Sequence, residues 1–175
     1  MTKTQGQFEK RPRDFYKTPA KVVLSLKDFL PSAFTFAEPC AGDGALVVHL
    51  EKLGGVCLLP LDIEPQADWV TEGDANNLTG EAVEWCNYII TNPPFSWNVL
   101  KPLMEKWIDL QPTILLLPAD FMHNLRFTPF LRSCEKIVSI GRVQWIEGSK
   151  GSGVENYCWY FFNGNNNKAT EFYGR

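Results

Sequence analysis

The 175-residue sequence has few of the residues that build metal and disulfide sites. It contains only two histidines, and its five cysteines show no C-x-x-C spacing, so no metal centre is expected. An odd number of scattered cysteines is typical of reduced thiols and predicts a cytoplasmic protein. No apolar run approaches the ~20 residues that span a bilayer, and the polar N-terminus lacks a secretory apolar stretch, so no membrane partner is expected.

What the sequence does contain is ordinary for a single globular domain: 45% of the residues are apolar and 21% are charged. We predict one domain over residues 14–175, preceded by a flexible basic arm, residues 1–13. Residues 31–119 carry twelve acidic side chains against three basic ones, whereas the flanking segments are mildly basic. Basic flanks suit a polyanion and an acidic middle suits a cationic or hydroxyl-rich ligand, although an ordinary, unevenly charged surface explains the same pattern.

Short apolar segments of strand character alternate with segments of helical periodicity. Strands are expected at 35–37, 56–61, 69–71, 88–91, 113–117, 136–140 and 157–162, and helices at 45–53, 79–86, 97–110 and 124–132. A first helix is expected to begin at Thr18-Pro19, with the threonine as N-cap, and to end before Pro31. The alternation predicts an α/β fold with a doubly wound, mostly parallel sheet of seven strands, a Rossmann-like fold that binds ligands at the carboxyl ends of its strands.

Acidic residues follow three successive predicted strands. Glu38 opens the sequence EPCAGDG, whose glycines allow the backbone to pass close to a ligand. A carboxylate at this strand tip would repel a pyrophosphate but suits a cationic group. Asp62, at the end of the next strand, suits the hydroxyls of a ribose, and Asp74 follows the third strand. Together the three acids predict a pocket for a ligand with an ammonium group, a ribose and a base.

The fourth strand end carries Asn92-Pro93-Pro94-Phe95. The two prolines remove two N–H donors and stiffen the turn. The side-chain carbonyl of Asn92 and a proline backbone carbonyl can then accept both protons of an exocyclic amino group, which leaves the lone pair of its nitrogen available. Phe95 offers a flat apolar face on which a base can stack.

In order and spacing, these motifs resemble those of the S-adenosylmethionine-dependent DNA adenine-N6 methyltransferases, in particular the small phage-encoded members of the NPPF type. The resemblance covers roughly residues 14–162, and it implies the class I methyltransferase variant of the Rossmann-like fold. The catalytic residues it implies are Asn92, Pro93, Pro94 and Phe95. The S-adenosylmethionine-binding residues it implies are Tyr16, Thr18, Glu38, Pro39, Cys40, Gly42, Gly44, Asp62, Ile63, Asp74, Ala75 and Asn92.

The same resemblance implies that a DNA adenine is flipped out and held against Phe95. Tyr157 or Trp159 is a candidate for the second face of the base, although a strand with five aromatic residues is more often core. Lys150, in a glycine-rich loop, and Arg11 and Arg13, in the N-terminal arm, are candidate contacts to the DNA backbone. Ordinary surface charge is an equally good explanation for Arg11 and Arg13, and a plain hairpin turn is an equally good explanation for the loop of Lys150.

Three interpretations stay open at this point. The first is a phage DNA adenine-N6 methyltransferase that protects the genome from host restriction. The second is an RNA methyltransferase that acts on an exocyclic amine, guanine N2 or adenine N6, and the third is a non-catalytic cofactor-binding subunit. No insertion large enough for a separate target-recognition domain interrupts the core, so a short recognised sequence, a homodimer or a partner subunit is expected.

Overall fold

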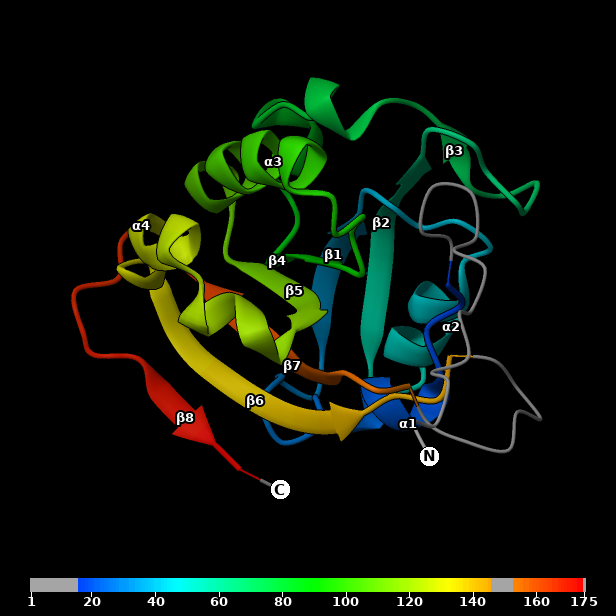
Figure 1. Ribbon diagram of the computed structural model, residues 1–175. Helices are drawn as coiled ribbons and strands as arrows, with labels where there is room; N and C mark the ends of the chain where they lie inside the picture. The colour runs from blue at the N-terminus through cyan, green and yellow to red at the C-terminus, as the bar shows by residue number, and fades with distance from the viewer. Residues whose placement is uncertain (1–15, 146–152, 175) are drawn as a thin grey trace.

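The computed structural model describes residues 16–145 and 153–174, and its centre is an eight-stranded sheet (Figure 1). The strands are β1 (Phe34–Glu38), β2 (Gly55–Asp62), β3 (Thr71–Glu72), β4 (Tyr88–Thr91), β5 (Thr113–Pro118), β6 (Cys134–Arg142), β7 (Asn156–Phe162) and β8 (Glu171–Tyr173). Their order across the sheet is β3-β2-β1-β4-β5-β7-β6-β8. The first five strands in this order, from β3 to β5, pair in parallel. Strand β7 is antiparallel to both β5 and β6, and β8 is parallel to β6. The predicted doubly wound, mostly parallel sheet is confirmed, with one strand more than expected.

Helices cover both faces of the sheet (Figure 1). On one face lie α1 (Ala20–Leu24) and α2 (Ala45–Glu51), and on the other lie α3 (Trp97–Leu110) and α4 (Thr128–Leu131). Four 3₁₀ turns complete the connections in the described residues: η2 (Ala75–Asn77), η3 (Glu81–Val83), η4 (Ala119–His123) and η5 (Leu125–Phe127).

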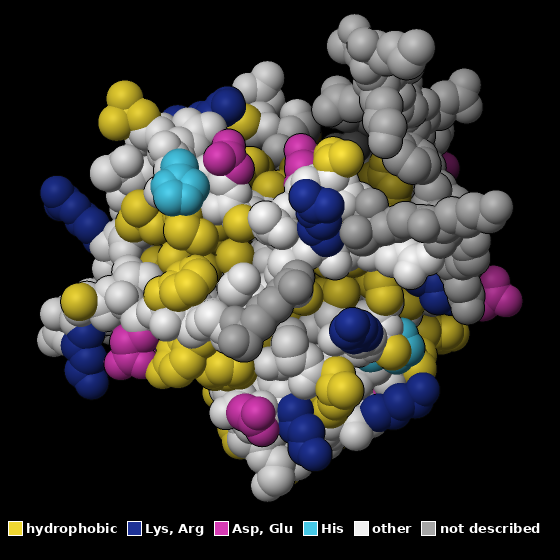
Figure 2. Space-filling view, turned by 60° about the horizontal axis from the view of Figure 1, so that its bottom comes forward, with side chains coloured by type: hydrophobic (Ala, Val, Ile, Leu, Met, Phe, Trp, Pro, Cys, Tyr) yellow, Lys and Arg dark blue, Asp and Glu magenta, His cyan; other side chains and the backbone are white. Residues whose placement is uncertain are grey.

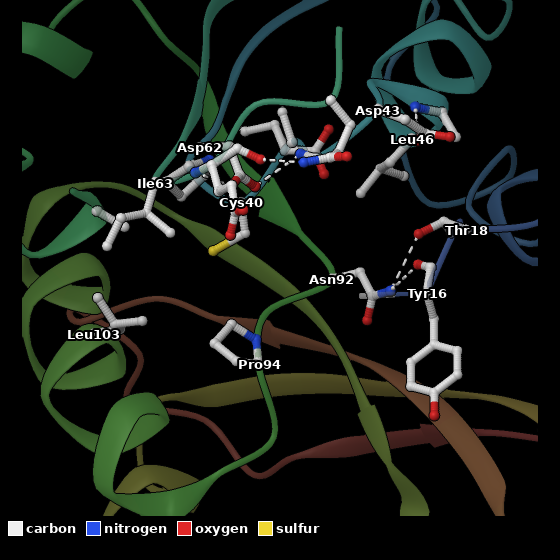
Figure 3. A pocket seen from close by; sticks show the side chains of 18 of the residues that line it. Tyr16, Thr18, Cys40, Asp43, Leu46, Asp62, Ile63, Asn92, Pro94 and Leu103 are labelled. Carbon is white, nitrogen blue, oxygen red and sulfur yellow. Dashed lines mark hydrogen bonds between the residues drawn. The ribbon is translucent and has the colours of Figure 1, made fainter. Parts of the chain in front are cut away.

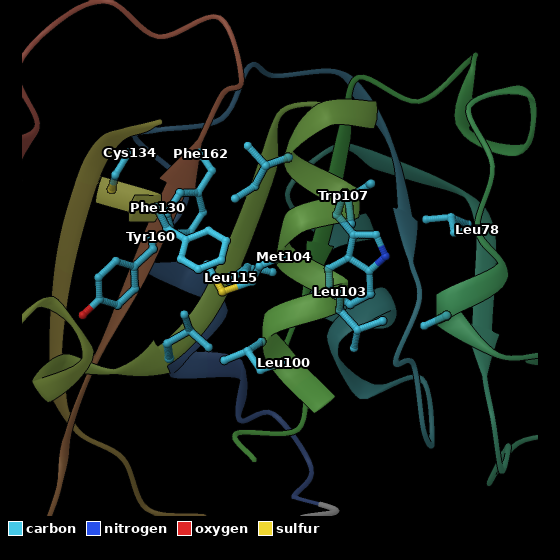
Figure 4. Close-up of a cluster of buried hydrophobic side chains, with 14 of the residues drawn as sticks. Leu78, Leu100, Leu103, Met104, Trp107, Leu115, Phe130, Cys134, Tyr160 and Phe162 are labelled. Atoms are coloured by element: carbon cyan, nitrogen blue, oxygen red, sulfur yellow. The ribbon is translucent and has the colours of Figure 1, made fainter. Parts of the chain in front are cut away.

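The central strand β5 is buried along its whole length, as its lack of alternation predicted. Because side chains alternate along a strand, Leu115 and Leu117 pack toward α3 while Ile114 and Leu116 pack toward α1 and α2. Figure 4 shows the α3 side, where a row of apolar residues on the helix meets the sheet: Leu100, Leu103, Met104 and Trp107. The sheet is thereby fixed between two cores, and the carboxyl ends of its parallel strands lie at one edge.

Several predicted elements are shorter than expected. The segment 79–86 forms only η3, because Val83 and Cys86 are its only buried residues and three i→i+3 bonds satisfy its backbone. The segment 124–132 divides into η5 and α4, and the strand expected at 69–71 is the two-residue β3. The strand β8 was not predicted, because its three residues are mostly exposed and carry no apolar pattern.

The first helix also differs from its prediction. Pro19, not Thr18, is its N-cap, and regular helix ends at Leu24, after which turns lead to Leu30. The side chain of Thr18 is buried and makes no capping hydrogen bond to the helix. Its hydroxyl instead has a partner on the loop after β4.

Candidate active site

The carboxyl ends of the parallel strands surround a cavity of about 750 Å³ (Figure 3). Its walls come from the segment before α1, the ends of β1, β2 and β4, the turn η2 and the first turns of α3. Twelve predicted site residues line it: Tyr16, Thr18, Glu38, Pro39, Cys40, Gly42, Asp62, Ile63, Asp74, Ala75, Asn92 and Pro94. Residues far apart in the sequence therefore meet at one site, as expected for the strand ends of a parallel sheet.

Four further predicted residues do not line this cavity. Pro93 and Gly44 are buried without lining it, whereas Phe95 lines a smaller neighbouring cavity. Tyr157 is also buried, and its ring lies 5.8 Å from that of Phe95. Arg11, Arg13 and Lys150, like the N-terminal arm, fall outside the described residues.

The glycine loop after β1 is tied to the end of β2. The N–H of Gly42 donates to the Asp62 carboxylate at 2.8 Å, and the N–H of Ala41 donates to the Leu61 carbonyl at 2.9 Å. Gly44 precedes α2 with a φ of 76°, in the left-handed region that glycine adopts most easily. A Cβ on Gly44 would lie 2.1 Å from the ring of Trp69, so a larger residue would displace the indole.

Glu38 is the most unusual charged group of the site. Its side chain is 1% exposed, and its Oε2 atom has no hydrogen-bond partner. Burial, reinforced by the charges of Asp62 and Asp43, raises the pKa of this carboxyl well above its usual range. A cationic group in the cavity would supply both the missing partner and the missing counter-charge.

Asp62 and Asp74 are held in different ways. The two carboxylate oxygens of Asp62 accept from the backbone N–H groups of Gly42 and Glu64, each at 2.8 Å, and each oxygen keeps a further lone pair for a ligand hydroxyl. Asp74 accepts from the backbone and the side chain of Asn76 through its Oδ1 atom. These two hydrogen bonds lower the pKa of Asp74, so it is an ionised acceptor at the cavity wall.

Cys40 lies near these acids, and its thiol is not activated by its surroundings. Burial, followed by the charges of Asp62 and Glu38, raises the pKa of its thiol far above the ordinary value. The thiol is therefore protonated at neutral pH, and nucleophilic thiol chemistry requires the thiolate.

Asn92 has a fixed orientation. Its Nδ2 atom donates to the Tyr16 carbonyl at 3.3 Å and to the Thr18 hydroxyl at 3.2 Å, two bonds that Figure 3 draws. Because the amide nitrogen is held by the segment before α1, its Oδ1 atom lies on the opposite side and is available as an acceptor. The hydroxyl of Thr18, predicted as a helix cap, thus orients the asparagine of the NPPF turn.

A row of aromatic rings continues from this turn. Phe95 packs on Tyr157 at 5.8 Å between ring centroids, Tyr157 on Trp145 at 5.0 Å, and Trp145 on Tyr16 at 5.8 Å. Burial and the nearby Glu155 raise the pKa of Tyr157 to about 12, so its hydroxyl is neutral. Trp145 was not predicted as a site residue, because nothing in the sequence brings the residues after β6 next to the segment before α1.

Several other residues of the cavity wall were not predicted. Val99 and Leu103 of α3 line it, which depends on how this helix is rotated against the sheet. An ion pair of 3.4 Å joins Lys17 to Asp43 across its rim. The loop that carries Asp43 was recognised in the sequence, but its contact with Lys17 has no signal there. In residues 16–145 and 153–174, no group of three or more His, Cys, Asp and Glu side chains could hold a metal ion.

The fold is that of the class I methyltransferases, and three solved structures illustrate it. A proposed RNA methyltransferase from Pyrococcus horikoshii has a TM-score of 0.62 at 16% identity, over 89% of this chain and 90% of that chain. The M protein of the type I restriction enzyme EcoKI has a TM-score of 0.58 at 11% identity, over 90% of this chain and 47% of the M protein. A proposed class I S-adenosylmethionine-dependent methyltransferase from Listeria monocytogenes has a TM-score of 0.61 at 10% identity, over 90% of this chain and 65% of that one.

At these identities the similarity establishes the fold alone, and the chain spans only about half of the EcoKI M protein. No family model matches the sequence, and no curated protein matches it by sequence. None of the helices in the described ranges has the length and apolar character needed to cross a membrane.

Proposed function

We propose that this protein binds S-adenosylmethionine and methylates the N6 amino group of adenine in DNA. The residues of the large cavity fit the three parts of that cofactor. Glu38, with its unpartnered buried oxygen, would hold the ammonium group, and Asp62 would accept from the ribose hydroxyls. Asp74 would accept from the adenine amino group. When bound, the cofactor supplies an electrophilic methyl group.

The orientation of Asn92 carries the proposal. Its amide nitrogen is committed to Tyr16 and Thr18, so its oxygen is the group that can meet a substrate. An exocyclic amino group needs acceptors, and the two prolines that follow Asn92 have no N–H that would repel it. We infer that Asn92 Oδ1 and the Pro93 carbonyl accept the two amino protons and orient the lone pair of the nitrogen. The nitrogen becomes acidic only once it carries the methyl group, so its surplus proton can pass to water and no strong base is needed.

Adenine in a duplex would have to leave the base stack to reach this turn. Phe95 offers a ring beside the acceptors, and Tyr157 and Trp145 extend the aromatic surface. On the face that Figure 2 presents, basic side chains are spread among hydrophobic ones and do not form one dense patch. We also propose that a second copy or a partner subunit contributes to target recognition and that the enzyme protects phage DNA from restriction.

Transfer of tritium from labelled S-adenosylmethionine tests the proposal. Unmethylated duplex DNA and total RNA are supplied in parallel, and the labelled nucleoside is identified. We expect N6-methyladenine from DNA. We also expect Asn92→Ala to lower the turnover rate by roughly 10²- to 10³-fold, the usual cost of losing one such polar contact. Label in RNA alone would establish the RNA alternative, and an unaffected Asn92→Ala variant would overturn the catalytic assignment.

A further inference from the structure

The turn η5 presents an apolar side chain to solvent. Leu125 is 87% exposed, more than any other large apolar residue in the part of the chain that the structure describes. A single exposed leucine is common on protein surfaces and needs no explanation by itself. Leu125 differs from such residues because its turn is rigidly held and lies next to the NPPF turn.

The turn is rigidly anchored. Phe127 is fully buried and packs its ring on Tyr160 and Phe130, with centroids 5.6 and 5.9 Å away. The Phe127 N–H donates to the Asn124 carbonyl at 2.8 Å, and the Asn124 side chain accepts from the N–H of Arg126. The anchored turn therefore holds Leu125 in its exposed position, with little freedom to pack back onto the protein surface.

The same turn forms one wall of a cavity next to the NPPF turn. This cavity, of about 110 Å³, is lined by Phe95 and Trp97 and by both sequence neighbours of Leu125, Asn124 and Arg126. The guanidinium of Arg126 lies over the Trp97 ring at 5.3 Å from its centroid. A cation next to Leu125 in the sequence therefore lines the same cavity as Phe95, the proposed base-binding residue.

We propose that Leu125 inserts into duplex DNA beside the target adenine and stabilises the opened stack, while Arg126 contacts the adjoining phosphate. Enzymes that act on an extruded base must compensate for its lost pairing and stacking, and apolar side chains such as leucine serve as wedges between base steps. A phosphate beside the wedge would be met by the guanidinium. The inference rests on the proposed function and adds to it a preference for duplex substrate.

Single-turnover methylation by Leu125→Ala tests the inference. Three duplexes carry a site that the wild-type enzyme methylates, and they differ only in the partner of the target adenine: thymine, a mismatched base or an abasic position. The matched control is Leu24→Ala, since Leu24 is 57% exposed on α1 and lines neither cavity. We expect Leu125→Ala to be slower by roughly tenfold or more opposite thymine and within about threefold of wild type opposite the abasic position.

The outcomes are distinct. A Leu125→Ala protein that is equally slow on all three duplexes, or as fast as wild type opposite thymine, would refute the wedge. If Leu24→Ala showed the same pattern, the effect would not belong to η5 and the wedge would again be refuted. A wild-type protein that methylates no DNA would refute the proposed function itself, and the wedge with it.

Discussion

Replacement of Glu38 by glutamine keeps the shape of this buried cavity residue but removes its ability to ionise when a cationic ligand binds. In the proposed complex this carboxylate holds the ammonium group of S-adenosylmethionine. A hydrogen bond to a charged group contributes about 1.5–3 kcal/mol, and each 1.4 kcal/mol corresponds to tenfold in affinity. We therefore expect Glu38→Gln to raise the Kd for S-adenosylhomocysteine, which keeps the ammonium group, by roughly 10- to 100-fold.

A second ligand makes the test specific. Methylthioadenosine has the ribose and adenine but no amino acid portion, so its affinity should change less than about twofold in Glu38→Gln. Titration calorimetry with both ligands measures the difference, and Glu51→Gln, an exposed acid at the end of α2, is the control. Equal losses for the two ligands, or no loss for either, would refute the role of Glu38.

The same variant has an opposite expected effect on the stability of the ligand-free protein. Because the folded-state pKa of Glu38 is raised, the folded protein keeps a proton that the unfolded chain releases above the ordinary glutamate pKa of about 4.5. The contribution of Glu38 to the free energy of unfolding is therefore fully present below that pH, and it is lost as the pH rises toward the folded-state pKa. Glutamine does not titrate, so at pH 7 urea unfolding of Glu38→Gln should show a stability at least equal to that of wild type.

Two further substitutions test the supports of the site. Thr18→Val removes the hydroxyl that accepts a hydrogen bond from Asn92, a loss of about 0.5–1.5 kcal/mol, so we expect a single-turnover rate roughly 3- to 10-fold lower. Thr18→Ser keeps the hydroxyl and should react at nearly the wild-type rate. Equal rates for the valine and serine variants would contradict this role of Thr18. Gly44→Ala places a Cβ at positive φ against Trp69, so urea unfolding should show a loss of about 1–3 kcal/mol. The loss should be smaller in a Trp69→Ala background, and unchanged stability of Gly44→Ala would show that the backbone is not constrained there.

The acids of the cavity could be found in the sequence because a parallel sheet brings the carboxyl ends of its strands together. Once β1, β2 and β4 were recognised, Glu38, Asp62 and Asn92 had to lie near one another. The bounds of α3 and β4 were also predicted without error, since both elements carry strong apolar patterns between clear turn residues.

The remaining contacts depend on how the elements pack. Thr18 has the sequence context of a helix cap, but its burial beside the loop after β4 makes Asn92 the partner of its hydroxyl. The same reasoning applies to Trp145 and to the wall formed by Leu103, whose positions follow from the placement of β6 and the rotation of α3. A local pattern cannot specify such long-range neighbours.

The most direct test of the central claim is nucleoside mass spectrometry of DNA from cells that lack adenine methylation of their own and express this protein. We expect N6-methyladenine with the wild-type protein and none above background with Asn92→Ala made at the same level. Absence of N6-methyladenine from DNA with the wild-type protein, or its equal abundance with Asn92→Ala, would contradict the account.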